Sequence, residues 1–202
     1  MKRLIGSVVA SLAIALGVLG CAGQPSGPEW ITLIDGEKGL ENFYRLGGAN
    51  WRGEGGAIVA DQATTKGASN LVSKQLYRDF DLYVEFWADV NTNSGVYIRA
   101  PKPDVVNTAS GAYEVQIWDR NPNPKYSTGA LVNVAAVQPI HKAGGQWNVF
   151  EIHAKGGEIT VRMNGTVTVS TSNARNNEGR IALQFNPGTG TVKFRKVMLK
   201  PL

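Results

Sequence analysis

The chain has 202 residues, with 21 basic and 16 acidic side chains and a formal net charge of +5. This length suits one domain that buries about 70% of the surface exposed by its unfolded form, and the single cysteine excludes a disulfide framework. No run of basic residues is interleaved with aromatic residues, so the composition gives no support to nucleic-acid binding.

The first predicted element is an export signal. Lys2 and Arg3 precede an apolar run over residues 4–19, which is the layout of a secretory signal peptide. The run ends in Val18-Leu19-Gly20-Cys21, which resembles the lipobox of bacterial lipoproteins, where the cysteine thiol is acylated and becomes the new N-terminus. We predict a lipoprotein signal peptide over residues 1–20 and lipidation at Cys21. The alternatives are an ordinary signal peptide with an incidental cysteine, or an uncleaved anchor.

Residues 21–29 are rich in Gly, Pro and Ser without an apolar period, and they predict a flexible tether. The acyl chains on Cys21 would anchor the protein in a membrane. Ala22 rather than Asp follows the cysteine, which in Gram-negative bacteria favours the outer membrane. The predicted location is therefore the cell envelope, with the protein on the outer membrane facing the periplasm or the surface.

The remaining residues, 30–202, show apolar and polar side chains in alternation, which indicates half-buried strands. Asn164-Gly165 is the strongest hairpin signal, and Gly156-Gly157 predicts a second turn between strands. Many short strands joined by Gly-rich turns favour an all-β sandwich or jelly roll of two antiparallel sheets. The alternating runs cover residues 80–87, 95–99, 113–118, 150–154, 159–163, 181–185 and 192–197.

Two of these strands carry polar and aromatic residues on the face opposite the core. If Val96 and Ile98 point inward, Tyr97 and Arg99 point outward, and the same alternation turns Glu114, Gln116 and Trp118 outward. A carboxylate, a guanidinium, an amide and two aromatic rings suit a sugar, because rings cover C–H patches and planar polar groups bind neighbouring hydroxyls. Gln184 on a later strand is expected to join them. The alternative is a solvated strand face, with Arg99 and Glu114 as a cross-strand ion pair.

Several motifs resemble, in order along the chain, those of the 3-keto-disaccharide hydrolase domain family. The resemblance covers residues 30–202, and it is specific because the motifs occur together in family order. They include residues 33–36 (LIDG), 79–86 (DFDLYVEF), 93–99 (NSGVYIR), 113–119 (YEVQIWD), 128–131 (TGAL) and 181–184 (IALQ).

The resemblance implies a concanavalin A-like jelly roll with its ligand on the concave sheet, and cleavage of sugars or glycosides already oxidised at C3. A base would remove the acidified C2 proton, and the C1 substituent would then be eliminated. Carried onto this chain, Glu114 is the expected acid/base and Arg99 the cation that stabilises the enolate. Asp119 is a second carboxylate candidate, and the expected substrate-binding residues are Tyr97, Gln116, Trp118, Gln184 and Asn186.

One departure from the family concerns Asn186, which stands near the position where members commonly have a histidine. Asn cannot shuttle a proton at neutral pH. We predict no metal site and no cofactor, and any bound ion would be a hard divalent cation such as calcium. A non-catalytic carbohydrate-binding module is the alternative function, and an envelope structural or interaction protein is the third.

Overall fold

The computed structural model describes residues 24–27 and 29–202. The predicted signal peptide and Cys21 lie outside these residues. Within the described part of the chain, no helix combines the length and the apolar character that crossing a bilayer requires.

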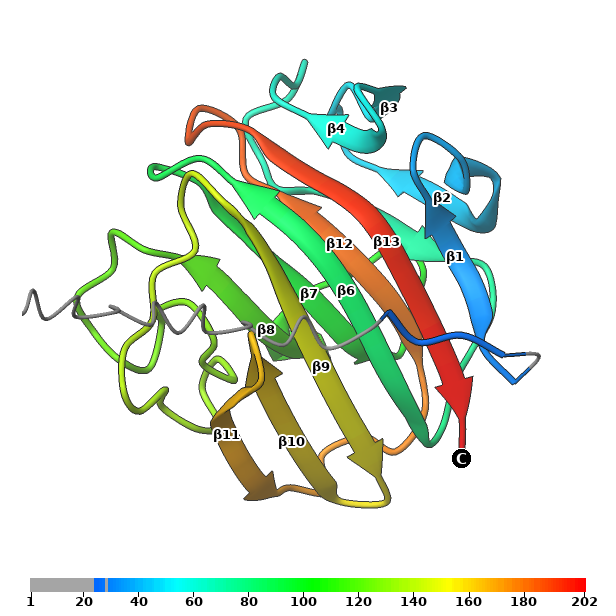
Figure 1. The fold of residues 1–202 in the computed structure, drawn as a ribbon, viewed down its shortest axis with the longest axis vertical. Coiled ribbons are helices and arrows are strands. Elements are labelled where there is room, and N and C mark those ends of the chain that lie inside the picture. Colours follow the sequence, from blue (N-terminus) through cyan, green and yellow to red (C-terminus); the bar gives the residue numbers. More distant parts are fainter. Residues whose placement is uncertain (1–23, 28) are drawn as a thin grey trace, which may run out of the picture.

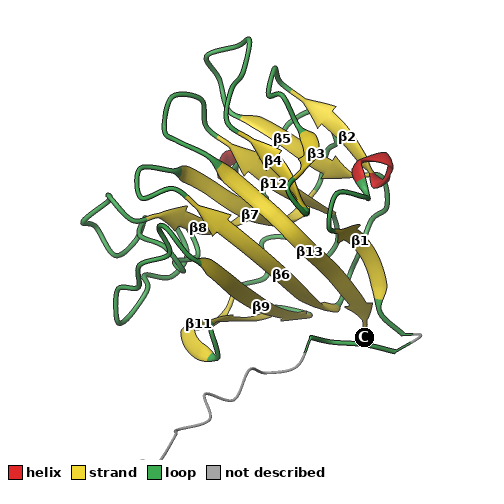
Figure 2. Ribbon diagram, turned by 45° about the horizontal axis from the view of Figure 1, so that its top comes forward, coloured by secondary structure: helices red, strands yellow, loops and turns green. Residues whose placement is uncertain are grey.

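Two antiparallel sheets stack face to face, which confirms the predicted all-β jelly-roll sandwich (Figures 1 and 2). The larger sheet has eight strands, and β1 joins it by pairing with β13. The order of the other seven is β11 (Thr166–Ser172), β10 (Glu158–Met163), β9 (Trp147–Lys155), β6 (Phe80–Ala88), β13 (Val192–Pro201), β4 (Ala57–Ala60) and β3 (Arg52–Glu54), with β1 spanning Ile31–Asp35.

The smaller sheet has five strands and carries the candidate site on its outer face. Its order is β2 (Phe43–Leu46), β5 (Ser69–Ser73), β12 (Arg180–Phe185), β7 (Asn93–Ala100) and β8 (Tyr113–Trp118). Two short 3-10 helices, η1 (Leu40–Asn42) and η2 (Thr108–Ser110), lie in connections between strands.

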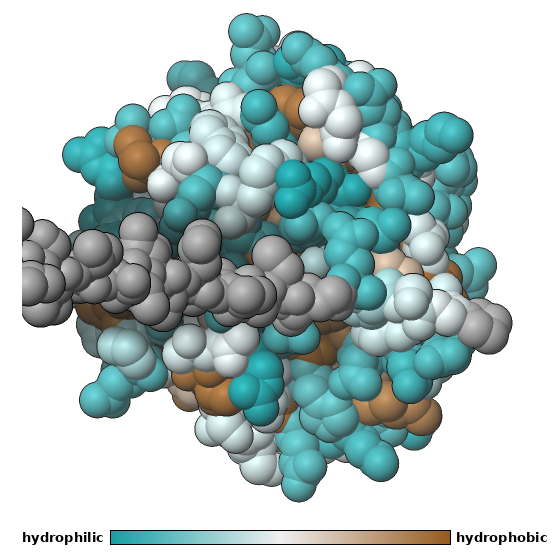
Figure 3. All heavy atoms as spheres, in the orientation of Figure 1, coloured by the Kyte–Doolittle hydropathy of each residue, from teal (hydrophilic) through white to brown (hydrophobic). Residues whose placement is uncertain are grey.

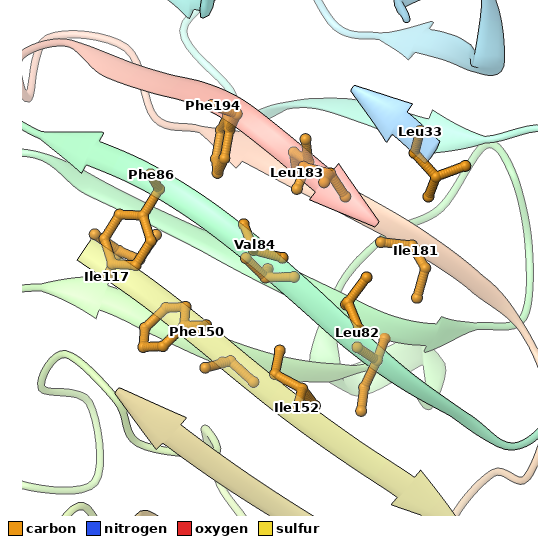
Figure 4. Close-up of a cluster of buried hydrophobic side chains, with 14 of the residues drawn as sticks. Leu33, Leu82, Val84, Phe86, Ile117, Phe150, Ile152, Ile181, Leu183 and Phe194 are labelled. Carbon is orange, nitrogen blue, oxygen red and sulfur yellow. The ribbon is translucent and has the colours of Figure 1, made fainter. Parts of the chain in front are cut away.

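The core lies between the sheets and is built from the apolar halves of the alternating strands (Figure 4). Phe86 on β6 and Phe150 on β9 pack with ring centroids 4.6 Å apart, and both side chains are fully buried. Leu183 on β12 and Ile117 on β8 supply the facing layer. Because most inward residues are apolar, the polar halves of the same strands are left on the two outer faces.

The turns follow the sequence signals. Asn164 and Gly165 both have positive φ, at 50° and 81°, and they join β10 to β11 in a two-residue hairpin. Asn and Gly adopt this left-handed conformation more readily than other residues, which explains why they occupy the turn. Gly156 and Gly157 join β9 to β10 in a second two-residue hairpin, in which Gly156 has a φ of 53°.

Candidate functional site

Polar side chains from neighbouring strands share the outer face of the five-stranded sheet. Tyr97 is paired with Glu114, and Gly95 is paired with Gln116, along β7 and β8. On the other side of β7, Gln184 of β12 is paired with Gly95. Because paired residues point to the same side of a sheet, Tyr97, Glu114, Gln116 and Gln184 line one surface. The alternation predicts these four on one face, but it also predicts Arg99 there, and Arg99 is not part of this surface.

Asn70 on β5 is a member of this surface that sequence reasoning missed. It is paired with Gln184, so four strands place Asn70, Gln184, Gly95 and Gln116 in one row. Its side chain is 2% exposed, and its Oδ1 has no hydrogen-bond partner among the described residues. A buried acceptor without a partner is costly, which favours a polar ligand at this point. The only sequence signal for Asn70 was its amide side chain, which stands in a short run of small and apolar residues.

A directional hydrogen-bond chain crosses the surface and ends on Tyr97, the cross-strand neighbour of Glu114. The Asn186 Nδ2 group donates to Gln184 Oε1 at 3.2 Å, and Gln184 Nε2 donates to the Tyr97 hydroxyl at 3.0 Å. Tyr97 is paired with Glu114 across the two strands, and each of the two groups shifts the pKa of the other. Since the Tyr97 hydroxyl already accepts from Gln184, its own proton is the one that it can offer to Glu114.

The environment of Glu114 changes its proton affinity. Burial raises the pKa of Glu114 from 4.5 to about 7, although the hydrogen bond from Tyr97 acts in the opposite direction. The pKa of Tyr97 is also raised, mainly by burial and further by the charge of Glu114, so this hydroxyl stays protonated. The surface therefore holds a carboxyl that exchanges its proton near neutral pH.

A hollow opens at one end of β8, beyond the row formed by Glu114, Gln116 and Trp118. It has a volume of about 600 Å³ and is lined by Trp118, Asn91, Arg120 and residues 188–190. Arg120 Nη1 donates to Asn91 Oδ1 at 3.1 Å, which fixes the polar side of the hollow opposite the half-buried indole. At the other end of the sheet, Val72, Ala182 and Val106 close the surface with an apolar cluster around Tyr97.

The expectation that Arg99 points outward beside Tyr97 is wrong. The pairing register shifts between Tyr97 and Ala100, and Arg99 itself has φ 53°, so one extra residue interrupts the alternation. Its side chain is fully buried and bonds to the carbonyl oxygens of Arg78, Gly156 and Asn176 and to Asp79. Gly156 and Asp79 belong to the eight-stranded sheet's connections, so Arg99 links the two sheets and does not accompany Glu114.

Asp119 is also held by the protein itself. Its carboxylate accepts hydrogen bonds from Thr128 Oγ1 at 2.6 Å and from the backbone N–H groups of Ala143 and Gly144 at 2.9 and 2.8 Å. These contacts fasten two long loops to the end of β8. They occupy both carboxylate oxygens, so Asp119 has a structural part here.

Asn186 occupies the end of the hydrogen-bond chain described above. Its backbone carbonyl accepts from Thr189 Oγ1 at 2.7 Å, which shapes the turn that borders the hollow. Among the residues that the structure describes, no three His, Cys, Asp or Glu side chains come together as metal ligands.

Comparisons with known proteins identify relatives of this fold. Residues 29–200 match the model of the 3-keto-alpha-glucoside-1,2-lyase-like domain. Two proteins of Parabacteroides distasonis ATCC 8503, each provisionally assigned as a glycosyl hydrolase, are similar in structure. The first is 24% identical in sequence, with a TM-score of 0.67, and the match covers 86% of this chain and 99% of that one. The second is 17% identical, with a TM-score of 0.71, and the match covers 86% of this chain and 94% of that one.

The β-glucanase of Bacillus licheniformis is a more distant match, with 12% identity and TM-score 0.53 over 89% of this chain and 95% of that one. No curated protein matches the sequence. The family model covers nearly the whole described chain and agrees with the motifs found in the sequence. The chain belongs to the 3-keto-alpha-glucoside-1,2-lyase-like domain family.

Proposed function

We propose that this chain cleaves 3-keto-glycosides by removing the proton on C2 and eliminating the substituent on C1. Membership of the family supports a carbohydrate-active role. The observation that carries the finer proposal is Glu114, a buried carboxyl with a pKa of about 7 on a surface lined by amides and Tyr97. A general base works best when its pKa lies near the working pH.

The proposed reaction has two proton transfers and no change in redox state. The Glu114 carboxylate takes the C2 proton, and the electron pair of that C–H bond forms an enolate on the C3 oxygen. The enolate collapses to the ketone, a C1=C2 double bond forms, and the C1 substituent leaves with the electron pair of its bond. The protonated Glu114 returns the proton to the leaving group, and water can then add to the enone.

The donor to the C3 oxygen is assigned to Gln116 rather than to Arg99. Gln116 Oε1 accepts the backbone N–H of Ile117 at 3.1 Å, so the amide is oriented and its Nε2 is left to donate to a ligand. A neutral amide stabilises an enolate less than a guanidinium does, since hydrogen bonds involving a charged donor are about twice as strong. Lipidation at Cys21, as predicted from the sequence, would hold this activity at the cell envelope.

The direct test incubates the full chain with 4-nitrophenyl 3-keto-α-glucoside and measures nitrophenol against a blank without protein. We expect release that depends on the 3-keto group, with 4-nitrophenyl α-glucoside unreacted. Since Glu114 must be ionised to act as a base, kcat/KM is expected to rise with pH and to level off above about 7. Equal release from the two glucosides would contradict the proposal.

A carbohydrate-binding module is the second candidate function, and the position of Asp119 favours it. Acid/base catalysis usually uses two groups, whereas the second candidate carboxylate is held by Thr128, Ala143 and Gly144. The same incubation separates the two functions. Binding of the 3-keto-glucoside without release of nitrophenol would indicate the module.

Gly95→Ala tests the position of the Glu114 carboxyl. A Cβ at Gly95 would lie 2.9 Å from Glu114 Oε1, so the carboxyl must rotate away from its present place. The nearest atom ends a flexible side chain, but the backbone carbonyl oxygen of Val115 would lie 3.2 Å from the new Cβ, so we expect the free energy of unfolding to fall by about 1–3 kcal/mol. Release of nitrophenol is expected to fall at least tenfold, because small displacements of a catalytic group are costly. Unchanged release would show that the present carboxyl position is not required.

A further inference from the structure

A second hollow lies on the opposite side of the sandwich, on the outer face of the eight-stranded sheet. Its volume is about 470 Å³, and it is lined by β6, β9 and β10 together with Pro25 and Trp30 from the N-terminal segment. Figure 1 shows these three strands side by side in the front layer, with the described N-terminal segment, in blue, passing in front of this sheet. The volume is in the range of pockets that take small molecules.

The register of the strands arranges the lining side chains in two rows. One row contains Asp81, His153 and Thr160, and the other contains Tyr83, Glu151 and Arg162. His153 Nδ1 and Asp81 Oδ1 are 2.6 Å apart, so these two side chains of the first row bind each other. In the second row Glu151 lies between Tyr83 and Arg162, so a carboxylate and a guanidinium are neighbours.

The polar side chains of the second row, Tyr83, Glu151 and Arg162, can still form hydrogen bonds with a ligand. Among the described residues, the side chains of Glu151 and Arg162 make no hydrogen bond or ion pair, although they are cross-strand neighbours. Tyr83 lines the hollow, and its hydroxyl makes no hydrogen bond within the described part of the chain. A hydroxyl, a carboxylate and a guanidinium around one hollow form a set of donors and acceptors that a ligand can satisfy.

The N-terminal segment is fixed over this face by contacts of its own. Gln24 Nε2 donates to Glu85 Oε2 at 3.1 Å, and the backbone N–H of Trp30 donates to the backbone carbonyl of Gly27 at 3.2 Å. Glu29 lies 3.7 Å from Lys200. These contacts hold the Trp30 indole, which is half-buried, at the border of the hollow. Figure 3 shows that the coloured surface on this side of the molecule mixes hydrophilic and apolar residues.

We propose that this hollow is a second saccharide-binding site, which takes a neutral sugar unit and lies on the opposite face from Glu114. The half-buried Trp30 indole offers aromatic surface to C–H faces, while Glu151 and Arg162 offer planar groups that bind neighbouring hydroxyls. The acidic groups Asp81 and Glu151 disfavour an anion, and the basic groups beside them disfavour a cation. A polyhydroxyl ligand without charge fits this balance.

The test follows the five indole N–H resonances of the full chain, labelled with ¹⁵N, during titration with maltose and with cellobiose. We expect at least one of these neutral disaccharides to shift the Trp30 resonance in a saturable way. The Glu151→Gln and Arg162→Ala variants are each expected to weaken this binding about tenfold, which corresponds to the loss of one hydrogen bond to a charged group. Lys155→Ala, on the same strand but outside the hollow, is the matched control and should bind as the parent does.

Three outcomes would overturn the second site. The Trp30 resonance stays unmoved by both disaccharides up to their solubility limit, or its shift persists unchanged in the Glu151→Gln and Arg162→Ala variants, or glucuronate binds more tightly than either neutral sugar. These outcomes are independent of the proposed glycoside cleavage, because nitrophenol release reports on Glu114 and the Trp30 resonance reports on the other sheet.

Discussion

Arg99→Met is expected to lower the free energy of unfolding by about 3–5 kcal/mol, the typical cost of removing one partner from a buried charged network. The substitution keeps most of the side-chain volume but leaves the carbonyl oxygens of Gly156 and Asn176 without their donor. Asp79 would lose its ion-pair partner, which lies 3.2 Å away. Since these groups belong to both sheets, we expect the loss to weaken the whole sandwich, measured by urea unfolding monitored by tryptophan fluorescence.

Arg78→Met is the matched control for this measurement. The Arg78 side chain is exposed and reaches Glu178 only at 3.9 Å, so its removal should change the free energy of unfolding by less than about 1 kcal/mol. Any nitrophenol release by Arg99→Met, measured at a temperature where the variant is folded, should stay within about threefold of the parent if Arg99 acts only in stability. Equal unfolding free energies for Arg99→Met and the parent would contradict this assignment.

The failure of the sequence prediction at Arg99 has a local cause. In residues 95–99 the alternating pattern places every second side chain on the same face of the sheet, and the structure follows this pattern from Gly95 to Ile98. A bulge then adds one residue, and the φ of 53° at Arg99 turns its side chain between the sheets. Bulges are set by contacts distant in sequence, here with the connection at Gly156 and with Asn176, so a period-two pattern carries no sign of them.

The sequence pattern predicts some strands of the molecule and misses others. The long strands β6, β9 and β10 have one apolar face, and their alternation predicts them directly. The short strands β4 and β5 are buried on both faces, so they show no alternation and were not predicted. Asn70 was missed with β5, because its place beside Gln184 depends on the pairing of strands that lie more than a hundred residues apart.

The buried carboxyl of Glu114 lowers the stability of the fold when it is ionised. At pH 8 the Glu114 carboxyl is ionised in a buried position, which costs free energy that a neutral side chain would not pay. Tyr97 offsets part of this cost through its hydrogen bond. Natural proteins keep such groups where activity depends on them, so substitutions at catalytic positions often stabilise the fold while abolishing turnover.

Glu114→Gln is therefore expected to reduce nitrophenol release from 4-nitrophenyl 3-keto-α-glucoside at least a hundredfold, the usual size of general acid–base catalysis. Gln has nearly the same shape and can still accept the hydrogen bond from Tyr97, but it cannot take a proton from C2. Glu158→Gln, an exposed carboxyl at the start of β10, is the matched control and should retain full release. Full turnover by Glu114→Gln would remove Glu114 from the mechanism.

The same variant should change how stability depends on pH. The folded protein holds the Glu114 proton up to a pKa of about 7, whereas the unfolded chain releases it near 4.5. Between these values the folded state binds more protons, so the contribution of Glu114 to the free energy of unfolding falls by about 3 kcal/mol as the pH rises. Other carboxyls titrate alike in both proteins, so Glu114→Gln should match the parent near pH 4.5 and unfold at a higher temperature at pH 8. A variant that loses turnover and is also less stable at pH 8 would indicate a misfolded site rather than a missing base.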